Sequence, residues 1–202
     1  MKQTLIIFSR YPEAGKTKTR MIPALGAEGA AQLQKRLSEH TLSQAREFQQ
    51  QTEVEIKVYF AGGNKDLMQD WLGKDLSYQE QAKGDLGERM EQAFVDNKKA
   101  KIVIIGIDCP SITPTVLQNA FNYLENRDLV LGEAADGGYY LIGLKVEDDV
   151  PTQLFRGIDW GTETVFNSTI AIAKNLSLNT KVLPVLRDID RPEDLDLLAL
   201  LE

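Results

Sequence analysis

Short apolar runs alternate with longer amphipathic segments along the chain, and this alternation most constrains the fold. The run at residues 102–107 is apolar and rich in β-branched side chains, which is typical of a central strand covered on both faces. Residues 27–51 carry apolar side chains at helical spacing and predict a long helix. Further strands are expected at 4–8, 54–60, 76–79, 129–131, 139–144 and 181–186, and further helices at 67–72, 87–97, 113–124, 162–173 and 192–201. Such alternation predicts right-handed crossovers and a mostly parallel α/β sheet.

Composition narrows the class of protein. The chain has 202 residues, enough for one domain over residues 1–202, and a formal net charge of −7, which argues against nucleic-acid binding. No apolar run reaches the length of a membrane span, and the first residues lack a signal-peptide cleavage site, so we expect a cytoplasmic protein. A Cys–His nucleophilic pair is not expected, because the single histidine, His40, lies mid-helix and far from the loop that holds Cys109.

A basic loop follows the first predicted strand. Residues 10–17 almost match a P-loop, but Arg10 replaces its first glycine, and Pro23 and Gly26 interrupt the helix that should follow. The loop nevertheless concentrates positive charge in an acidic protein, at Arg10, Lys16, Lys18 and Arg20. It is either a solvated basic loop or a phosphate-binding site, since ligands of open α/β sheets bind beyond the carboxyl ends of strands.

Acidic side chains follow other predicted strands. Asp108 comes after the most apolar strand, and its position fits a magnesium or manganese ligand. The alternative is a turn or a helix cap, but Thr113 already supplies that cap. Asp188 and Asp190 share one side of an extended backbone and can offer oxygens to the same cation.

Two glycine-containing turns are further candidates. Asp136 precedes Gly137 and Gly138, a pattern typical of a hairpin turn that can also present a carboxylate to a substrate. A second turn, at residues 81–90, leads into a predicted helix whose first N–H groups can hold a base edge or a phosphate. Its candidate nucleotide-binding residues are Gln81, Gly84, Asp85 and Gly87.

Taken in order, these motifs resemble a bacterial glycosyltransferase-like family with the nucleotide-diphospho-sugar transferase (GT-A) fold, some members of which are labelled arsenosugar biosynthesis glycosyltransferases. The resemblance spans nearly the whole chain and rests on matching segments at 8–20, 81–90, 106–110, 136–143, 160–162 and 188–194. The chain departs from related nucleotidyltransferases: it lacks the Leu-Ala-Gly-Gly signature, and Asp188, Asp190 and Arg191 replace two asparagines and a threonine. The resemblance implies a three-layer α/β/α Rossmann-like fold with a mostly parallel mixed sheet.

The resemblance also implies a function. It implies a metal-dependent glycosyltransferase that moves a sugar from a nucleotide-diphospho-sugar to a small acceptor. Arg10, Lys18 and Arg20 would bind the nucleotide, while Asp108 and Asp190 would hold Mg²⁺ or Mn²⁺. Asp136 would be the catalytic residue on the acceptor side, beside acceptor-binding residues Gly137, Gly138, Trp160 and Thr162.

Two other functions stay open. One is a guanylyltransferase-like nucleotidyltransferase that couples a nucleoside triphosphate to a phosphorylated small molecule and releases pyrophosphate. The other is a non-catalytic nucleotide-binding protein. A homodimer also stays open, because sequence alone does not locate exposed apolar patches.

Overall fold

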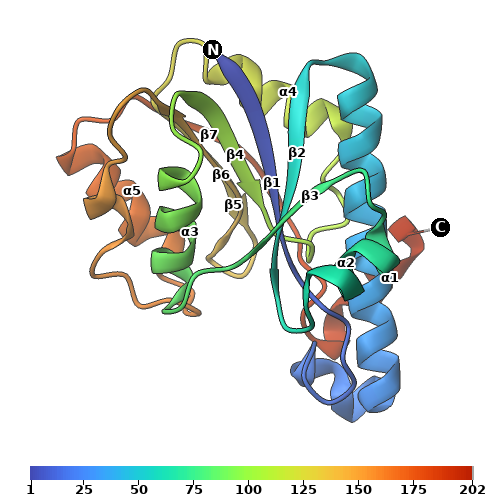
Figure 1. Ribbon diagram of the computed structural model, residues 1–202. Helices are drawn as coiled ribbons and strands as arrows, with labels where there is room; N and C mark the ends of the chain where they lie inside the picture. Colours follow the sequence, from blue (N-terminus) through green and yellow to red (C-terminus); the bar gives the residue numbers. More distant parts are fainter. Residues whose placement is uncertain (202) are drawn as a thin grey trace.

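The computed structural model describes residues 1–201. Seven strands form one sheet, and helices pack on both of its faces (Figure 1). The strands are β1 (Lys2–Arg10), β2 (Val54–Ala61), β3 (Ser77–Glu80), β4 (Ala100–Ile105), β5 (Leu129–Ala134), β6 (Tyr139–Val146) and β7 (Thr180–Leu186). The helices are α1 (Ile22–Gln51), α2 (Lys65–Leu72), α3 (Leu86–Val95), α4 (Pro114–Tyr123) and α5 (Val165–Asn175), with 3₁₀ helices η1 (Thr19–Met21), η2 (Thr152–Phe155) and η3 (Pro192–Leu201).

The strand order is β3-β2-β1-β4-β6-β5-β7, and β6 runs antiparallel to both of its neighbours. The other pairings are parallel, which confirms the predicted mostly parallel mixed sheet. The chain leaves β1 toward β2 on one side, while β4 joins β1 on the other. Ligands of α/β sheets bind at such a switch point, outside the carboxyl ends of the strands.

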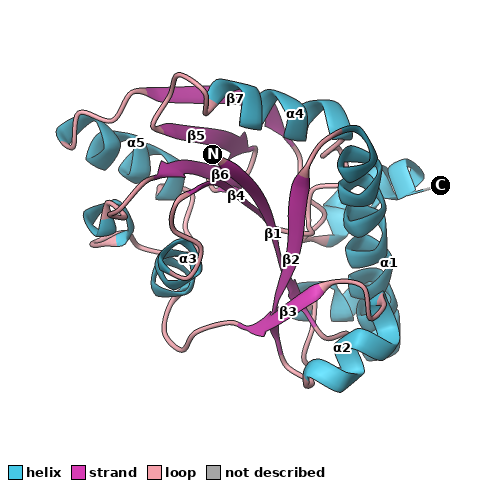
Figure 2. Ribbon diagram, turned by 45° about the horizontal axis from the view of Figure 1, so that its top comes forward, coloured by secondary structure: helices cyan, strands magenta, loops and turns pink. Residues whose placement is uncertain are grey.

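Both faces of the sheet are buried at its central strands, as the continuous apolar runs predict. Leu5 and Ile7 of β1 belong to the core under α1, α2 and α4, whereas Ile6 belongs to the core under α3 and α5. Figure 2 shows these two helical layers on opposite sides of the sheet. Within residues 1–201, none of the helices combines the length and the apolar character needed to cross a bilayer.

Several elements differ from the predicted ones in their bounds or their helix type. β4 ends at Ile105, the last residue in register with β6, so Asp108 lies in a turn beyond the strand. The helical stretch Ile22–Gln51 is broken at Gly26 (φ 70°), so the long regular helix begins after that glycine, as predicted for residues 27–51. The closing segment, Pro192–Leu201, is the 3₁₀ helix η3, and its residues Leu195, Leu197, Leu198 and Leu201 pack against the core.

Candidate active site

A cavity of about 590 Å³ opens at the carboxyl ends of β1 and β4. Phe8, Met90 and Tyr139 contribute apolar and aromatic surface to its lining. Its charged lining residues are Arg10, Lys16, Lys18, Arg20, Arg89, Asp108, Asp188 and Asp190. The structure thus brings the basic loop and the acidic strand ends into one site. Such a cavity has the size and mixed polarity of a small-molecule site.

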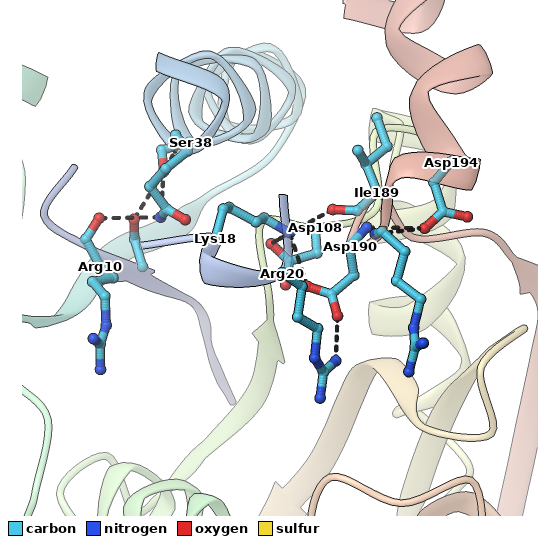
Figure 3. Close-up of polar contacts among 11 residues, drawn as sticks. Arg10, Lys18, Arg20, Ser38, Asp108, Ile189, Asp190 and Asp194 are labelled. Atoms are coloured by element: carbon cyan, nitrogen blue, oxygen red, sulfur yellow. Dashed lines mark hydrogen bonds and ion pairs between the residues drawn. The ribbon is translucent and has the colours of Figure 1, made fainter. Parts of the chain in front are cut away.

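Lys18 lies at the centre of this site (Figure 3). Its Nζ is 2.8 Å from Oδ1 of Asp108 and 3.6 Å from Oδ1 of Asp190, and it donates a hydrogen bond to the Ile189 carbonyl. The Lys18 side chain is only 4% exposed. Its backbone adopts the left-handed conformation (φ 47°), which a non-glycine residue rarely does. The fold therefore holds this ammonium between two carboxylates.

The loops after β4 and β7 are joined beside Lys18. The Ile189 N–H donates to the Asp108 carbonyl over 2.7 Å, and the Ile189 side chain is fully buried in the core. The Asp190 N–H donates to the Asp194 carboxylate, and Asp190 also forms an ion pair with Arg20. Burial would raise the pKa of Asp190, but Lys18 and Arg20 outweigh burial and hold that pKa below its ordinary value. Asp190 is therefore a carboxylate at neutral pH.

The surroundings of Asp188 raise its pKa, in contrast to those of Asp190. Burial, reinforced by the negative charges of Asp136 and Asp108, raises the pKa of Asp188 to about 7, while Lys18 acts in the other direction. Its Oδ1 is buried and has no hydrogen-bond partner. Such an orphaned acceptor leaves a coordination position open to a cation or a donor group.

The donor set fits a divalent cation on one condition. Asp108, Asp188 and Asp190 supply the carboxylate oxygens that Mg²⁺ and Mn²⁺ prefer, and one of these oxygens is unpartnered. However, Lys18 occupies the contact between Asp108 and Asp190. Across residues 1–201, no three acidic, histidine or cysteine side chains already stand in metal-binding arrangement. The carboxylates can therefore hold a metal only after Lys18 moves.

The second glycine-containing turn builds one wall of the cavity. The Gln81 amide lines the cavity and donates to the carbonyls of Tyr59 (2.9 Å) and Ser9 (3.3 Å). Asp85 caps α3 in a reciprocal pair with Glu88, and Gly84 precedes this cap with φ 112°. A Cβ on Gly87 would lie 2.5 Å from the Trp160 ring. Of the four predicted nucleotide-binding residues of this turn, Gln81 lines the cavity, whereas Gly84, Asp85 and Gly87 do not.

Arg89 is a cavity residue that the sequence analysis missed. Its Nε donates to the Gly84 carbonyl over 2.9 Å, which fixes the guanidinium at the cavity wall. Its position near the start of the helix that Asp85 caps could have pointed to Arg89 from the sequence.

A second cavity of about 440 Å³ adjoins the first, with Arg20, Asp188 and Asp190 lining both. Its lining also includes Asp136, Thr162, Glu163, Arg187 and Arg191. The Gly138 N–H donates to Oδ1 of Asp136 over 2.9 Å, so this carboxylate is held by its own turn. Gly137 packs against the Glu163 backbone, and Trp160 packs edge-on against Tyr139 with centroids 6.3 Å apart. Of the proposed acceptor-side residues, Asp136 and Thr162 line this cavity, whereas Gly137, Gly138 and Trp160 do not.

We predict that Cys109 is inert in the native protein. The residue is 2% exposed, and burial, aided by the charges of Asp188 and Asp108, raises the pKa of its thiol to about 12. The expectation that His40 lies far from this loop was wrong, because its ring bonds to the Pro110 carbonyl over 2.9 Å. Ellman's reagent at pH 8 should therefore label the thiol only in denaturant. Rapid stoichiometric labelling of the native protein would contradict this prediction.

Comparisons with known proteins show the family and the fold of the chain. The family model "Uncharacterized protein conserved in bacteria (DUF2064)" matches residues 41–162, and a search of curated proteins matched none. The crystal structure of a candidate nucleotide-diphospho-sugar transferase from Desulfovibrio desulfuricans shares 32% identity and a TM-score of 0.87. That alignment covers 98% of this chain and 87% of that protein.

More distant structures share the fold alone. A CMP:2-keto-3-deoxy-manno-octonic acid synthetase complexed with CTP has a TM-score of 0.61 at 10% identity, covering 98% of this chain and 97% of that one. The manganese complex of Rv0371c from Mycobacterium tuberculosis has a TM-score of 0.57 at 15% identity, covering 97% of both chains. The chain belongs to the DUF2064 family and has the GT-A-like fold of the nucleotide-diphospho-sugar transferases.

Proposed function

We propose that the protein is a nucleotide-utilising transferase that moves a sugar from a nucleotide-diphospho-sugar to a small acceptor. The observation that carries this proposal is the pair of adjoining cavities that share Arg20, Asp188 and Asp190. A nucleotide-diphospho-sugar in the larger cavity and a small acceptor molecule in the smaller cavity would meet at these shared residues. The similarity to a candidate nucleotide-diphospho-sugar transferase, and the fold shared with a synthetase that binds CTP, support the nucleotide substrate.

Cationic side chains of the larger cavity would bind the diphosphate. Arg10 makes its side-chain contact with the Lys16 carbonyl, and Arg89 bonds to the Gly84 carbonyl. Both guanidiniums therefore keep donors for phosphate oxygens. Asp108 and Asp190, with Asp188, would hold Mg²⁺ or Mn²⁺, which neutralises charge on the departing diphosphate when bound. A manganese complex of a protein with the same fold supports the choice of a divalent cation.

Asp136 would act on the acceptor. Its carboxylate lines the smaller cavity and is oriented by the Gly138 N–H. A new bond would form between the acceptor oxygen and the sugar carbon as the bond from that carbon to the diphosphate breaks. The nucleoside diphosphate would leave with the bonding electrons, and the hydroxyl proton would pass to Asp136.

One observation favours nucleotidyl transfer as the second candidate. The smaller cavity is lined by Arg20, Arg187 and Arg191, cations that suit a phosphorylated acceptor. Arg187 is paired with Asp196 at 3.0 Å, whereas the Arg191 guanidinium makes no ion pair with any residue within 1–201. In this reaction, the acceptor phosphate would attack the α-phosphorus of a nucleoside triphosphate and pyrophosphate would leave.

The released product separates the two reactions. The protein is incubated with Mn²⁺ and either nucleotide-diphospho-sugars with sugar or alcohol acceptors, or nucleoside triphosphates with sugar phosphates. Release of nucleoside diphosphate that depends on the acceptor supports glycosyl transfer. Pyrophosphate release, seen only with nucleoside triphosphates, would support nucleotidyl transfer in place of glycosyl transfer. The absence of product with either set of substrates would contradict both reactions.

Asp136→Asn should lower kcat for glycosyl transfer by about 10²–10⁴-fold, because the amide cannot accept the acceptor proton. Binding of the nucleotide-diphospho-sugar should change little, since Asp136 lines the smaller cavity. Steady-state kinetics and nucleotide titration measure the two effects. Asp148→Asn, in the exposed loop after β6, is the matched control and should leave both values unchanged. A wild-type kcat for Asp136→Asn would exclude Asp136 as the base.

A further inference from the structure

We propose that Lys18 is a built-in counter-ion that keeps Asp108 and Asp190 closed to divalent cations until nucleotide phosphates take over its ammonium. Only the second half of this inference, in which nucleotide phosphates take over the ammonium, rests on the proposed nucleotide substrate. Its first half, competition between Lys18 and a metal ion, concerns the protein alone. A divalent cation and the nucleotide would then bind together, each one favouring the other.

The competition follows from geometry. Nζ of Lys18 lies 2.8 Å from Oδ1 of Asp108, and Mg²⁺ would need that oxygen at about 2.0–2.1 Å. The same ammonium is 3.6 Å from Asp190 and bonds to the Ile189 carbonyl, so it fills the space between the two loops. The ammonium and a bridging metal ion cannot occupy this space together.

Because Lys18 is buried, its ammonium leaves the carboxylates only when another anionic partner is present. The Lys18 side chain is 4% exposed, so its charge depends on these protein oxygens rather than on water. Removing a buried ammonium from its carboxylates without a new anionic partner is costly. Lys18 lines the larger cavity, where phosphates of a nucleotide would supply that partner. The metal would then restore positive charge at the vacated carboxylates of Asp108 and Asp190.

Other cations of this loop are placed differently. Arg20 also contacts Asp190, but its side chain is 57% exposed and it has no contact with Asp108. Lys16, two residues before Lys18, is 67% exposed and forms an ion pair with Glu13. Lys16 lines the larger cavity, so the control is Lys74, which is 78% exposed, lines neither cavity and carries the same charge.

The first test measures binding of Mn²⁺ alone, from the electron paramagnetic resonance signal of the free ion. Lys18→Met should bind Mn²⁺ at least tenfold more tightly than the wild type, because it frees both carboxylates. Lys18→Gln, which keeps a donor for the Ile189 carbonyl, should show the same gain and serves if the methionine variant does not fold. Lys74→Met should match the wild type. Adding Asp108→Asn to either Lys18 variant should remove the gain.

Unchanged Mn²⁺ affinity in folded Lys18 variants would overturn the proposal, as would a gain that survives Asp108→Asn.

The second test measures Mn²⁺ affinity with a nucleoside diphosphate present, corrected for the association of the two in solution. The diphosphate should tighten Mn²⁺ binding in the wild type, and this coupling should fall at least tenfold in Lys18→Met. Equal coupling in both proteins would overturn the displacement of Lys18 by phosphate. Failure of the proposed transfer reaction would leave the Mn²⁺ result intact, so the two failures are distinguishable.

Discussion

Asp108→Asn should lower the rate of transfer by about 10²–10³-fold, the loss expected when one charge-stabilising group is removed from an active site. The amide would weaken the proposed metal site and would also take away the closest anionic partner of Lys18. The variant should still fold, because Lys18 keeps its contacts with Asp190 and the Ile189 carbonyl. Initial rates at saturating acceptor, with a circular dichroism melt of the same sample, measure both expectations.

Asp70→Asn is the matched control for Asp108→Asn. Asp70 lies in α2, is 70% exposed and contacts Lys74 at 3.8 Å, so its loss should change the rate less than twofold. A folded Asp108→Asn protein with a wild-type rate would remove Asp108 from the proposed mechanism.

Gly137→Ala should destabilise the protein by on the order of 3 kcal/mol. Gly137 has φ 88°, and a Cβ there would lie 2.1 Å from the Glu163 carbonyl oxygen. The obstructing atom belongs to the backbone, so relieving the contact requires a shift of the segment that also carries Thr162. Urea denaturation measures the change in the free energy of unfolding.

The neighbouring Gly138 is the control for this position. A Cβ on Gly138 would contact only the Asp136 carboxylate, at 3.2 Å, and that side chain can move. Gly138→Ala should therefore cost about 0.5 kcal/mol or less. Equal losses in the two variants would show that the contact with Glu163 does not govern the stability of this turn.

Much of the fold follows from local sequence patterns. The apolar runs that became β1 and β4 predicted strands buried on both faces, and the Asp136-Gly137-Gly138 turn predicted the β5–β6 hairpin. The antiparallel direction of β6 follows from that short turn. The 3₁₀ form of η3 was missed because a run of leucines suits both helix types until its packing partners are known.

The residues of the candidate site were predictable from the sequence, but the contacts between them were not. Strand ends predicted that Asp108 and Asp190 would lie near the basic loop, since carboxyl ends of parallel strands share one edge. The position of Lys18 between these carboxylates depends on three loops far apart in sequence. Likewise, no local pattern shows that Gly87 lies under Trp160, or that Oδ1 of Asp188 is buried without a partner.

The most direct test of the account is a calorimetric titration of UDP- and GDP-sugars into the protein with Mn²⁺ present. We expect saturable binding of at least one nucleotide-diphospho-sugar by the wild type. We also expect at least tenfold weaker binding by Asp108→Ala and by Arg10→Ala, and unchanged binding by Asp70→Asn. No binding to the wild type, or equal binding by all four proteins, would contradict a nucleotide site at the carboxyl ends of β1 and β4.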